Sequence, residues 1–322
     1  MATKDTVLRL LKNSTTFLSG EKIAQELQLS RTSVWKAIKE LEKAGYQFEH
    51  GPTGYRYLPS DVLDATEIKQ ELQNDQPHLH VQTMATSEST MQDAKLVAAK
   101  GADYPALFVA DMQENARGRF GRPFFAEPER GIYMSLLLHP NQEFDELPQY
   151  TLVAASACAK AIEKLTGAST QIKWVNDIYI NGKKVCGILS EAISDMESGR
   201  ISHVIIGMGI NFSLPQNEFP QEIQQKATSI FPDGHATITR NQLIIEIWKE
   251  LFAYLREPAN KEYLSFYRKK SFVLGKQVSF TQKGITYHGV AKSITNTGEL
   301  VVQTPQELKI LSSGEISLSS IN

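Results

Sequence analysis

Cysteine is scarce in this sequence, as are charge imbalance and long apolar runs. Cys158 and Cys186 are the only two cysteines in 322 residues, which argues against a disulfide framework or a zinc site and favours a reducing compartment. The formal net charge is -2, so a nucleic-acid site, if present, must be local. Since no segment reaches the length of a membrane span and the N-terminus carries no secretory signal, we expect a cytoplasmic protein with no membrane partner.

The remaining composition is that of an ordinary globular protein. Hydrophobic residues make up 41% of the chain, and the length predicts two or three domains. In the first domain, apolar residues recur at helical spacing in three segments, and the third can be capped by Ser30 and ended by Gly45. Two short strand-like runs then flank a glycine-rich turn at 50–54. This order predicts a winged helix-turn-helix over residues 1–60.

A winged helix-turn-helix places the start of its third helix in the major groove of DNA, while the wing contacts the backbone. The DNA contacts predicted on this basis are Arg31, Thr32, Ser33 and Lys36 on the helix, and Arg56 on the wing. Residues 1–58 hold nine basic against six acidic residues, so one copy should bind modestly and a dimer better. The alternatives are a solvated helix face and a protein-binding winged helix.

A short basic loop follows the apolar run at 106–110. Residues 117–122 read RGRFGR, with three arginines and two glycines. The segment is not a dinucleotide fingerprint, because Pro123 and two phenylalanines stand where a helix should begin. Glycines leave the backbone mobile, and guanidinium groups bind phosphate and carboxylate oxygens bidentately. The loop therefore predicts a flap over an anionic ligand, with a surface loop of no function as the alternative.

Polar residues interrupt the apolar segment 172–180, which reads IKWVNDIYI and predicts a strand. Burying Lys173, Asn176 and Asp177 is costly unless each has a partner, so these residues indicate a site. The Asn-Gly pair that follows predicts a tight hairpin turn. A later strand-like run at 203–212 contains two glycines, which favour close approach of a ligand or of another backbone.

The rest of the chain completes a multidomain α+β organisation. Helical patterns at 86–100, 148–165 and 240–255 alternate with strands, and we expect the helices on one side of a mixed sheet in a central domain over residues 65–272. Short strand-like runs past residue 274 predict a small β-barrel similar to an SH3 fold over 273–322.

Five motifs, in this order along the chain, resemble those of biotin protein ligases, and the winged helix in front makes the chain similar to the bifunctional type that also represses biotin genes. The motifs are SxST at 87–90, QxxxRGRxGR at 113–122, KWxND at 173–177, KxxGIL at 184–189 and GxGIN at 207–211. The terminal GEISL at 314–318 matches as well. The resemblance covers essentially the whole chain and implies a central domain of the class II synthetase-like biotin/lipoate ligase fold.

The resemblance implies a two-step, ATP-dependent ligase. Biotin and ATP first give biotinyl-5′-AMP and pyrophosphate, and the adenylate then biotinylates a lysine of the biotin carboxyl carrier protein of acetyl-CoA carboxylase or a related carboxylase. It also implies that the adenylate acts as corepressor: a homodimer forms and binds operator DNA of biotin genes. Mg²⁺ is the metal implied, with its ligands unidentified beyond the fact that asparagine oxygens suit it.

The resemblance also carries individual roles onto matching positions. Catalysis is assigned to Arg117, Arg119, Lys184 and Asp177. Biotin binding is assigned to Ser89, Thr90, Met91, Gln113, Arg117, Gly118, Arg119, Lys184, Gly187 and Ile188. ATP binding is assigned to Arg119, Arg122, Lys173, Asn176 and Asn211.

The chain departs from the family pattern at three of these motifs. Ala116 replaces the first glycine of the arginine loop, Met91 stands where an amide is common, and Val175 replaces the proline of KWPND. No departure removes a charged group. Three other interpretations stay open: a biotin-sensing transcription factor without catalysis, a lipoate ligase-like enzyme, and a ligase whose N-terminal domain binds no DNA.

Overall fold

The computed structural model describes residues 3–140, 148–194, 200–282, 284–312 and 316–318. The chain divides into two compact units. The first contains residues 1–63 with 239–241, and the second contains the remainder. No helix in the described ranges is long and apolar enough to cross a membrane.

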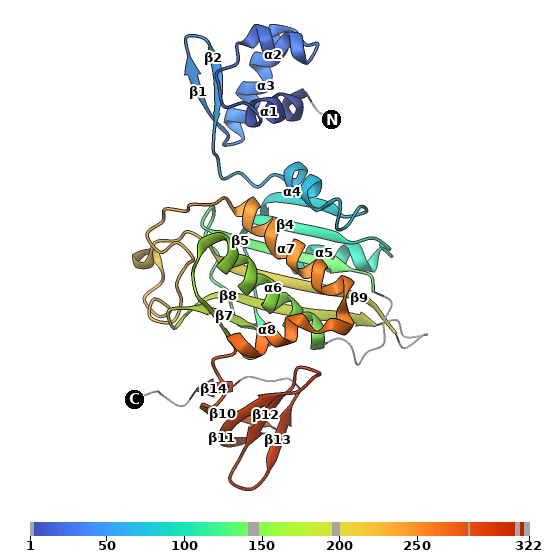
Figure 1. The fold of residues 1–322 in the computed structure, drawn as a ribbon, viewed down its shortest axis with the longest axis vertical. Helices are drawn as coiled ribbons and strands as arrows, with labels where there is room; N and C mark the ends of the chain where they lie inside the picture. The colour runs from blue at the N-terminus through green and yellow to red at the C-terminus, as the bar shows by residue number, and fades with distance from the viewer. Residues whose placement is uncertain (1–2, 141–147, 195–199, 283, 313–315, 319–322) are drawn as a thin grey trace. The chain divides into compact units, whose positions relative to one another are not determined.

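The first unit is a winged helix-turn-helix, as the sequence predicts (Figure 1). Its elements are α1 (Thr3–Lys12), α2 (Gly20–Glu26), α3 (Arg31–Lys43), β1 (Gln47–Gly51) and β2 (Gly54–Leu58). Ser30 caps α3 by accepting a hydrogen bond from the Ser33 amide at 3.0 Å. Gly54 has a φ of +138°, and a Cβ there would lie 2.1 Å from the Leu18 carbonyl oxygen, so only glycine fits this start of the wing.

The second unit is built on a seven-stranded mixed sheet in the order β3-β4-β5-β9-β8-β7-β6. The strands are β3 (His80–Ser87), β4 (Ala106–Gln113), β5 (Gly131–Leu138), β6 (Thr170–Lys173), β7 (Asp177–Ile180), β8 (Lys183–Ser194) and β9 (Ile201–Asn211). The β3–β4 pair is parallel and the other pairs are antiparallel. The strand predicted at 172–180 is therefore two strands, because the chain turns at residues 174–176 and β6 pairs with β7.

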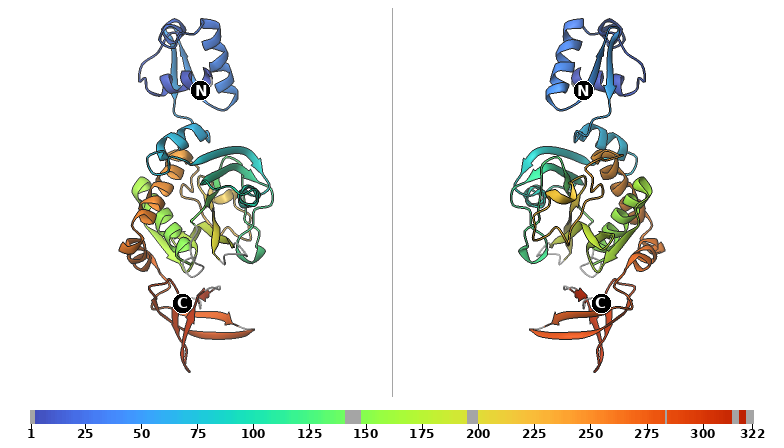
Figure 2. Two further views of the ribbon diagram at one scale, coloured as in Figure 1. Left: turned by 90° about the vertical axis from the view of Figure 1, so that its right-hand side faces the viewer. Right: turned by 90° about the vertical axis from the view of Figure 1, so that its left-hand side faces the viewer.

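Helices cover both faces of this sheet, and the expectation of helices on one side only is wrong. The helices are α4 (Ala65–Leu72), α5 (Thr90–Ala99), α6 (Pro148–Thr166), α7 (Arg240–Arg256) and α8 (Glu262–Lys270). Figure 2 shows α5 on the face opposite α6, α7 and α8. The alternation along β4 explains this, since Ala106 and Phe108 pack with Ala94 of α5 whereas Leu107 points to the other face and is equally buried.

The last segment forms a five-stranded antiparallel sheet in the order β13-β12-β11-β10-β14. Its strands are β10 (Gln277–Gln282), β11 (Ile285–Ile294), β12 (Leu300–Gln303), β13 (Leu308–Leu311) and β14 (Ile316–Leu318). The two edge strands, β13 and β14, are not paired with each other in the described part, so the expected SH3-like barrel is an open sheet. The first two residues of the GEISL motif lie outside the described residues.

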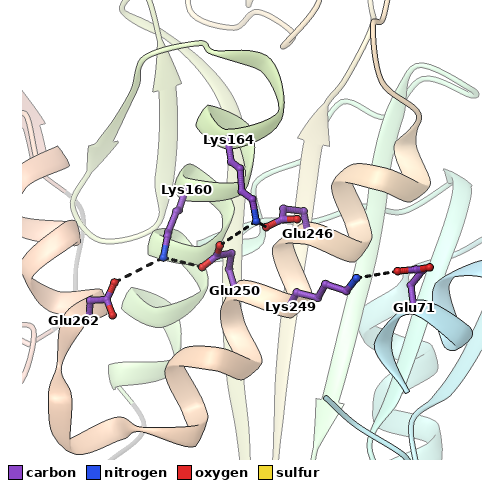
Figure 3. Close-up of polar contacts among 7 residues, drawn as sticks. All are labelled: Glu71, Lys160, Lys164, Glu246, Lys249, Glu250 and Glu262. Atoms are coloured by element: carbon purple, nitrogen blue, oxygen red, sulfur yellow. Dashed lines mark hydrogen bonds and ion pairs between the residues drawn. The ribbon is translucent and has the colours of Figure 1, made fainter. Parts of the chain in front are cut away.

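Ion pairs connect the helices on the α6 face (Figure 3). Lys160 of α6 lies 2.9 Å from Glu250 of α7 and 3.7 Å from Glu262 of α8. Lys164 lies 2.5 Å from Glu246, and Lys249 of α7 lies 2.9 Å from Glu71 of α4. The lysines are partly exposed, so each pair contributes little and the apolar contacts beneath them hold the layer.

Glu163 of α6 accepts hydrogen bonds from residues of β6 and α8. Its Oε1 accepts hydrogen bonds from the Thr170 amide at 2.8 Å, the Thr170 hydroxyl at 2.9 Å and Lys270 Nζ at 2.5 Å. Burial alone would raise the pKa of the Glu163 carboxyl, but the Lys270 and Thr170 hydrogen bonds outweigh it and lower the pKa. The carboxylate therefore joins α6, β6 and α8.

Replacing Glu163 with Gln should lower the free energy of unfolding at pH 7 by roughly 1–3 kcal/mol, because the charged hydrogen bonds are lost. The folded pKa lies below the unfolded value, so the wild-type advantage is present above the unfolded pKa and is lost as pH falls through the folded pKa. Urea unfolding at pH 7 and at about pH 3 measures the difference, with the pH set by the ordinary range for Glu. A difference that stays constant with pH would show that the charge does not contribute.

Candidate functional site

A cavity of about 220 Å³ opens in the second unit where the arginine loop meets β8, β9 and the β6–β7 turn. All but one of the residues predicted to bind biotin or ATP line it. They are Ser89, Thr90, Met91, Gln113, Arg117, Gly118, Arg119, Arg122, Lys173, Asn176, Lys184, Gly187 and Ile188, and the predicted catalytic Asp177 joins them. Residues up to 99 positions apart in sequence thus meet in one place.

Neutral hydrogen-bonding groups come from the start of α5 and the end of β4. Gln113 Oε1 accepts from the Thr90 amide at 2.8 Å and from the Thr90 hydroxyl at 3.2 Å. The Thr90 hydroxyl is also 2.7 Å from Ser135 Oγ. These bonds set the orientation of the Gln113 amide and leave its Nε2 to donate to a ligand.

Ser89 is the residue before α5 and has extended backbone, as an N-cap does. Its hydroxyl nevertheless makes no capping hydrogen bond within the described chain. The side-chain oxygen of an N-cap serine ordinarily accepts a hydrogen bond from a backbone amide in the first turn of the helix. The Ser89 hydroxyl is therefore available to a ligand in the cavity.

Three glycines of β8 and β9 form an apolar wall of the cavity. Gly187 and Gly209 are paired across the two strands. A Cβ at Gly209 would lie 2.7 Å from Phe124 Cζ, and a Cβ at Gly207 would lie 2.6 Å from Met91 Sδ. Larger residues would therefore collide with Phe124 and Met91, which explains glycines inside otherwise apolar strands.

Phe124 lines the cavity although it was not among the predicted site residues. Its amide donates to the Ala116 carbonyl at 3.0 Å, which closes the arginine loop at its base. Its ring packs edge-on against Tyr133 of β5. The signal in the sequence was the apolar pair directly after the arginines, in a segment that otherwise reads as polar.

The arginine loop contains one 3-10 turn at Arg119–Gly121 and does not continue into an α-helix. Gly118 donates to the Arg122 carbonyl at 2.8 Å, and Phe120 and Gly121 both have positive φ values, +58° and +71°. Arg119 Nη1 donates to Asn176 Oδ1 at 3.2 Å, which joins two motifs. Arg117 instead donates to the Gly121 carbonyl at 3.3 Å and so stiffens the loop itself.

Lys184 of β8 and Asp177 of β7 form an ion pair in the cavity. Lys184 Nζ lies 2.8 Å from Asp177 Oδ1. The contact lacks the geometry of a hydrogen bond, so the buried Oδ1 has no hydrogen-bond donor among the described residues. The two charges still attract each other, because Coulomb attraction at this distance does not require hydrogen-bond geometry. The pair leaves both groups able to exchange partners when a ligand enters.

The backbone of Lys184 is held on its other edge by a segment that follows β9. The Lys184 amide donates to the Lys226 carbonyl, and the Thr228 amide donates to the Lys184 carbonyl, both at 2.9 Å. Asn211 lies outside the described lining of the cavity, and its Nδ2 donates to the Thr228 carbonyl at 3.0 Å. Asn211 therefore holds this segment through its Nδ2, and its predicted contact with ATP stays a prediction.

The two cysteines lie behind the cavity as free thiols. Cys158 Sγ of α6 and Cys186 Sγ of β8 are 3.8 Å apart, and both residues are fully buried. Burial first, and then the neighbouring Cys158, raises the pKa of the Cys186 thiol. Both cysteines therefore act as small core residues rather than as reactive groups.

The predicted DNA-contact residues of the first unit separate into two groups. Arg31, Thr32 and Lys36 are exposed on α3. The Ser33 hydroxyl lies 2.8 Å from Ser30 Oγ and takes part in the helix cap, and Arg56 pairs with Glu49 while its guanidinium lies 4.8 Å from the centre of the Phe17 ring. The exposed three are therefore better placed to contact a ligand.

Trp35 is half-exposed beside them and was not among the predicted contacts. Its side chain lines a surface groove between α3 and the wing, together with Arg31, Thr32 and His50. An exposed tryptophan between two cationic residues of a helix was a visible signal in the sequence. It adds apolar surface to the exposed face of α3.

Family models match three parts of the chain. Residues 84–211 match the biotin/lipoate A/B protein ligase family, residues 3–56 match an HTH domain, and residues 273–319 match the biotin protein ligase C-terminal domain.

Full-length relatives and solved structures agree with these matches. The chain is 34% identical over 325 residues to the bifunctional ligase/repressor BirA of Bacillus subtilis, covering 98% of each, and 26% identical over 321 residues to that of Escherichia coli, covering 98% of this chain and 96% of the relative. The biotin protein ligase of Aquifex aeolicus in complex with biotin and ATP aligns with a TM-score of 0.62 at 27% identity, over 74% of this chain and 98% of that one. The chain belongs to the biotin protein ligase family and has the domain composition of its bifunctional ligase/repressors.

Proposed function

We propose that the protein activates biotin with ATP, transfers it to a lysine of a biotin carboxyl carrier protein, and represses biotin genes when the adenylate is bound. The observation that carries the proposal is the division of polar groups across the cavity. Neutral groups come from the β3–α5 junction and β4, and charged groups come from β6, β7 and β8. The arginine loop after β4 reaches the charged side through the hydrogen bond from Arg119 to Asn176. Three strand spacings separate β4 from β8, roughly 14 Å.

This separation suits an elongated ligand with a neutral polar head and a carboxylate tail. Biotin has that form, with a ureido group at one end and a carboxylate at the other. Ser89 and Gln113 are placed to hydrogen-bond the ureido group, while the glycine wall with Phe124 and Met91 accommodates the apolar middle. Lys184 is then the cation nearest the carboxylate.

In the first step a biotin carboxylate oxygen attacks the α-phosphorus of ATP, and pyrophosphate leaves. Both reactants are anionic, so fixed positive charge at the point of contact lowers the barrier. Lys184 supplies charge at the carboxylate, and Arg119, positioned by Asn176, supplies it at the phosphate. Arg122 extends the positive surface toward the leaving pyrophosphate.

In the second step a lysine amine of the carrier attacks the carbonyl of the mixed anhydride, and AMP leaves. The amine must be neutral and oriented, which requires an acceptor for its proton. Asp177 lies at the cavity wall and has a buried oxygen without a hydrogen-bond donor in the described structure. When Lys184 turns to the adenylate, Asp177 is left to orient the amine.

Mg²⁺ fits this site as a companion of ATP. The described residues contain no cluster of three metal-binding side chains. Mg²⁺ in nucleotide sites is commonly held by substrate phosphates with one or two protein oxygens. Asn176 and Asp177 can supply these, and the ion would screen charge on the triphosphate.

Repression follows if the adenylate stabilises a dimer that presents two winged helices to a two-fold operator. The exposed Arg31, Thr32 and Lys36 support DNA binding by α3. Retention of Lys184, Arg119 and Asp177 speaks against a sensor without catalysis. We place the protein in the cytoplasm, where ATP, carrier protein and DNA are available.

Replacing Lys184 with Ala should lower kcat for biotin-dependent pyrophosphate release by roughly 100- to 1,000-fold, because one preorganised cation is lost from the transition state. Lys183→Ala is the matched control, since the neighbouring Lys183 donates to the Gln224 carbonyl outside the cavity. Pyrophosphate release with biotin or lipoate as substrate measures the effect. Full activity in Lys184→Ala would overturn the role proposed for Lys184. A preference for lipoate over biotin would identify the protein as a lipoate ligase-like enzyme.

Replacing Lys36 with Ala should weaken DNA binding and reduce the slope of log K against log salt by about 0.9, the value for one phosphate contact. Lys39→Ala removes the same charge from the same helix, but Lys39 is paired with Glu42 at 2.7 Å and should change the slope less. Gel shifts on the promoter region of the biotin genes, with biotin and ATP present, measure both. Equal slopes for the two variants would remove Lys36 from the interface.

A further inference from the structure

The β6–β7 turn carries much of the charged side of the cavity. Lys173 ends β6, Asp177 begins β7, and Asn176 lies in the turn between them. All three line the cavity. Because β6 is the edge strand of the sheet, this turn has a strand neighbour on one side only.

Trp174 connects the turn to the C-terminal sheet. The side chain is buried, with 3% of its surface exposed. Its Nε1 donates a hydrogen bond to the Gly298 carbonyl at 3.0 Å. Gly298 belongs to the tight turn at 295–298 that joins β11 to β12.

The acceptor of this bond is itself held firmly. Arg268 of α8 donates to the Ile294 carbonyl from both Nε and Nη2, at 3.0 and 2.7 Å, and its Nη2 also donates to Asn296 Oδ1 at 2.9 Å. Gly298 has a φ of +91°, and a Cβ there would lie 2.7 Å from Leu152 Cδ2 of α6. The backbone of this turn therefore packs directly on the helical layer.

A second bond holds the next residue of the β6–β7 turn. The Tyr267 hydroxyl donates to the Val175 carbonyl at 2.9 Å. Burial first, and then the Asp177 carboxylate, raises the pKa of Tyr267 well above its ordinary value, so the phenol keeps its proton and remains a donor. Trp174 and Val175 thus anchor the turn to α8 and the C-terminal sheet, while Asn176 faces the cavity and bonds to Ile188 in both directions at 2.9 Å.

We propose that Trp174 is a positioning residue for adenylate formation: the Gly298 carbonyl, through the Trp174 indole, holds the β6–β7 turn so that Lys173, Asn176 and Asp177 stay in register with the reacting groups. The C-terminal sheet acts on the first chemical step by this contact. The inference rests on the proposed ligase function. The contact supports the charged side of the cavity only. Ser89, Thr90 and Gln113 on the neutral side have no part in it.

The test is Trp174→Phe, which keeps the ring and removes the N–H donor. Trp248→Phe is the matched control, since Trp248 is fully buried and its Nε1 has no hydrogen-bond partner among the described residues. For Trp174→Phe we expect kcat for pyrophosphate release to fall roughly five- to tenfold, the equivalent of one lost hydrogen bond, with the Kd for biotin unchanged within about twofold. Trp248→Phe should keep the wild-type kcat.

A kcat for Trp174→Phe within twofold of the Trp248→Phe value would overturn the proposal, and so would an equal loss in biotin affinity and kcat. Hydrogen exchange of the Ile188 amide gives a readout that needs no activity, because this amide donates to the Asn176 carbonyl. It should exchange faster in Trp174→Phe and at the wild-type rate in Trp248→Phe. An unchanged Ile188 rate in Trp174→Phe would also overturn the proposal.

Gly298→Ala displaces the carbonyl that accepts from Trp174 and leaves the indole donor in place. It should reproduce the loss in kcat expected for Trp174→Phe. Its effect should be smaller in the Trp174→Phe background than in the wild type, because the part that acts through the Trp174–Gly298 contact is already lost there. Full additivity would contradict a shared contact. If the wild-type chain forms no biotin adenylate, the proposed function fails, and the exchange measurement still decides whether Trp174 positions the turn.

Discussion

The site depends on holding cations and a carboxylate together at a turn between two short strands. Lys184 is 2.8 Å from Asp177, and Arg119 donates to Asn176 one residue away. Each cation comes from a different part of the chain, so the turn that carries Asn176 and Asp177 is where both meet. Unpaired charges in a partly covered cavity would be costly, and the pairing compensates each charge in a way that anionic substrates can replace.

Several neighbouring segments hold the charged residues of the site in place. The segment at 226–228 holds the backbone of Lys184, and the bond between Ala116 and Phe124 closes the arginine loop at its base. The glycines of β8 and β9 allow Phe124 and Met91 to lie against the sheet. Trp174 and Tyr267 anchor the turn from behind, which brings α8 and the C-terminal sheet into the support of the site. The proposed ligase step thus draws on the arginine loop, β8, β9, α8 and the C-terminal sheet.

The winged helix has one core and one exposed basic helix face. Its three helices share one small core, and the exposed face of α3 is left with Arg31, Thr32, Trp35 and Lys36. Arg56 pairs with Glu49 and lies over the Phe17 ring, so its guanidinium is less free to reach DNA than the exposed Arg31 and Lys36 of α3. The proposed control by dimerisation would be effective, because affinity rises steeply when two copies act together.

The sequence by itself determined the winged helix and a basic loop, because caps, hairpin turns and clustered arginines are local signals. The family resemblance added site residues, of which all but Asn211 line the cavity. The sequence could not reveal that Trp174, Val175 and Asn176 form a turn inside an apolar run, since hydrophobicity alone does not distinguish one long strand from a tight hairpin. Partnerships over long separations were equally hidden. Only the tertiary structure decided that Asn211 holds a backbone segment, that Arg56 is paired, and that Trp174 donates to Gly298, because each depends on which distant group lies within hydrogen-bonding distance.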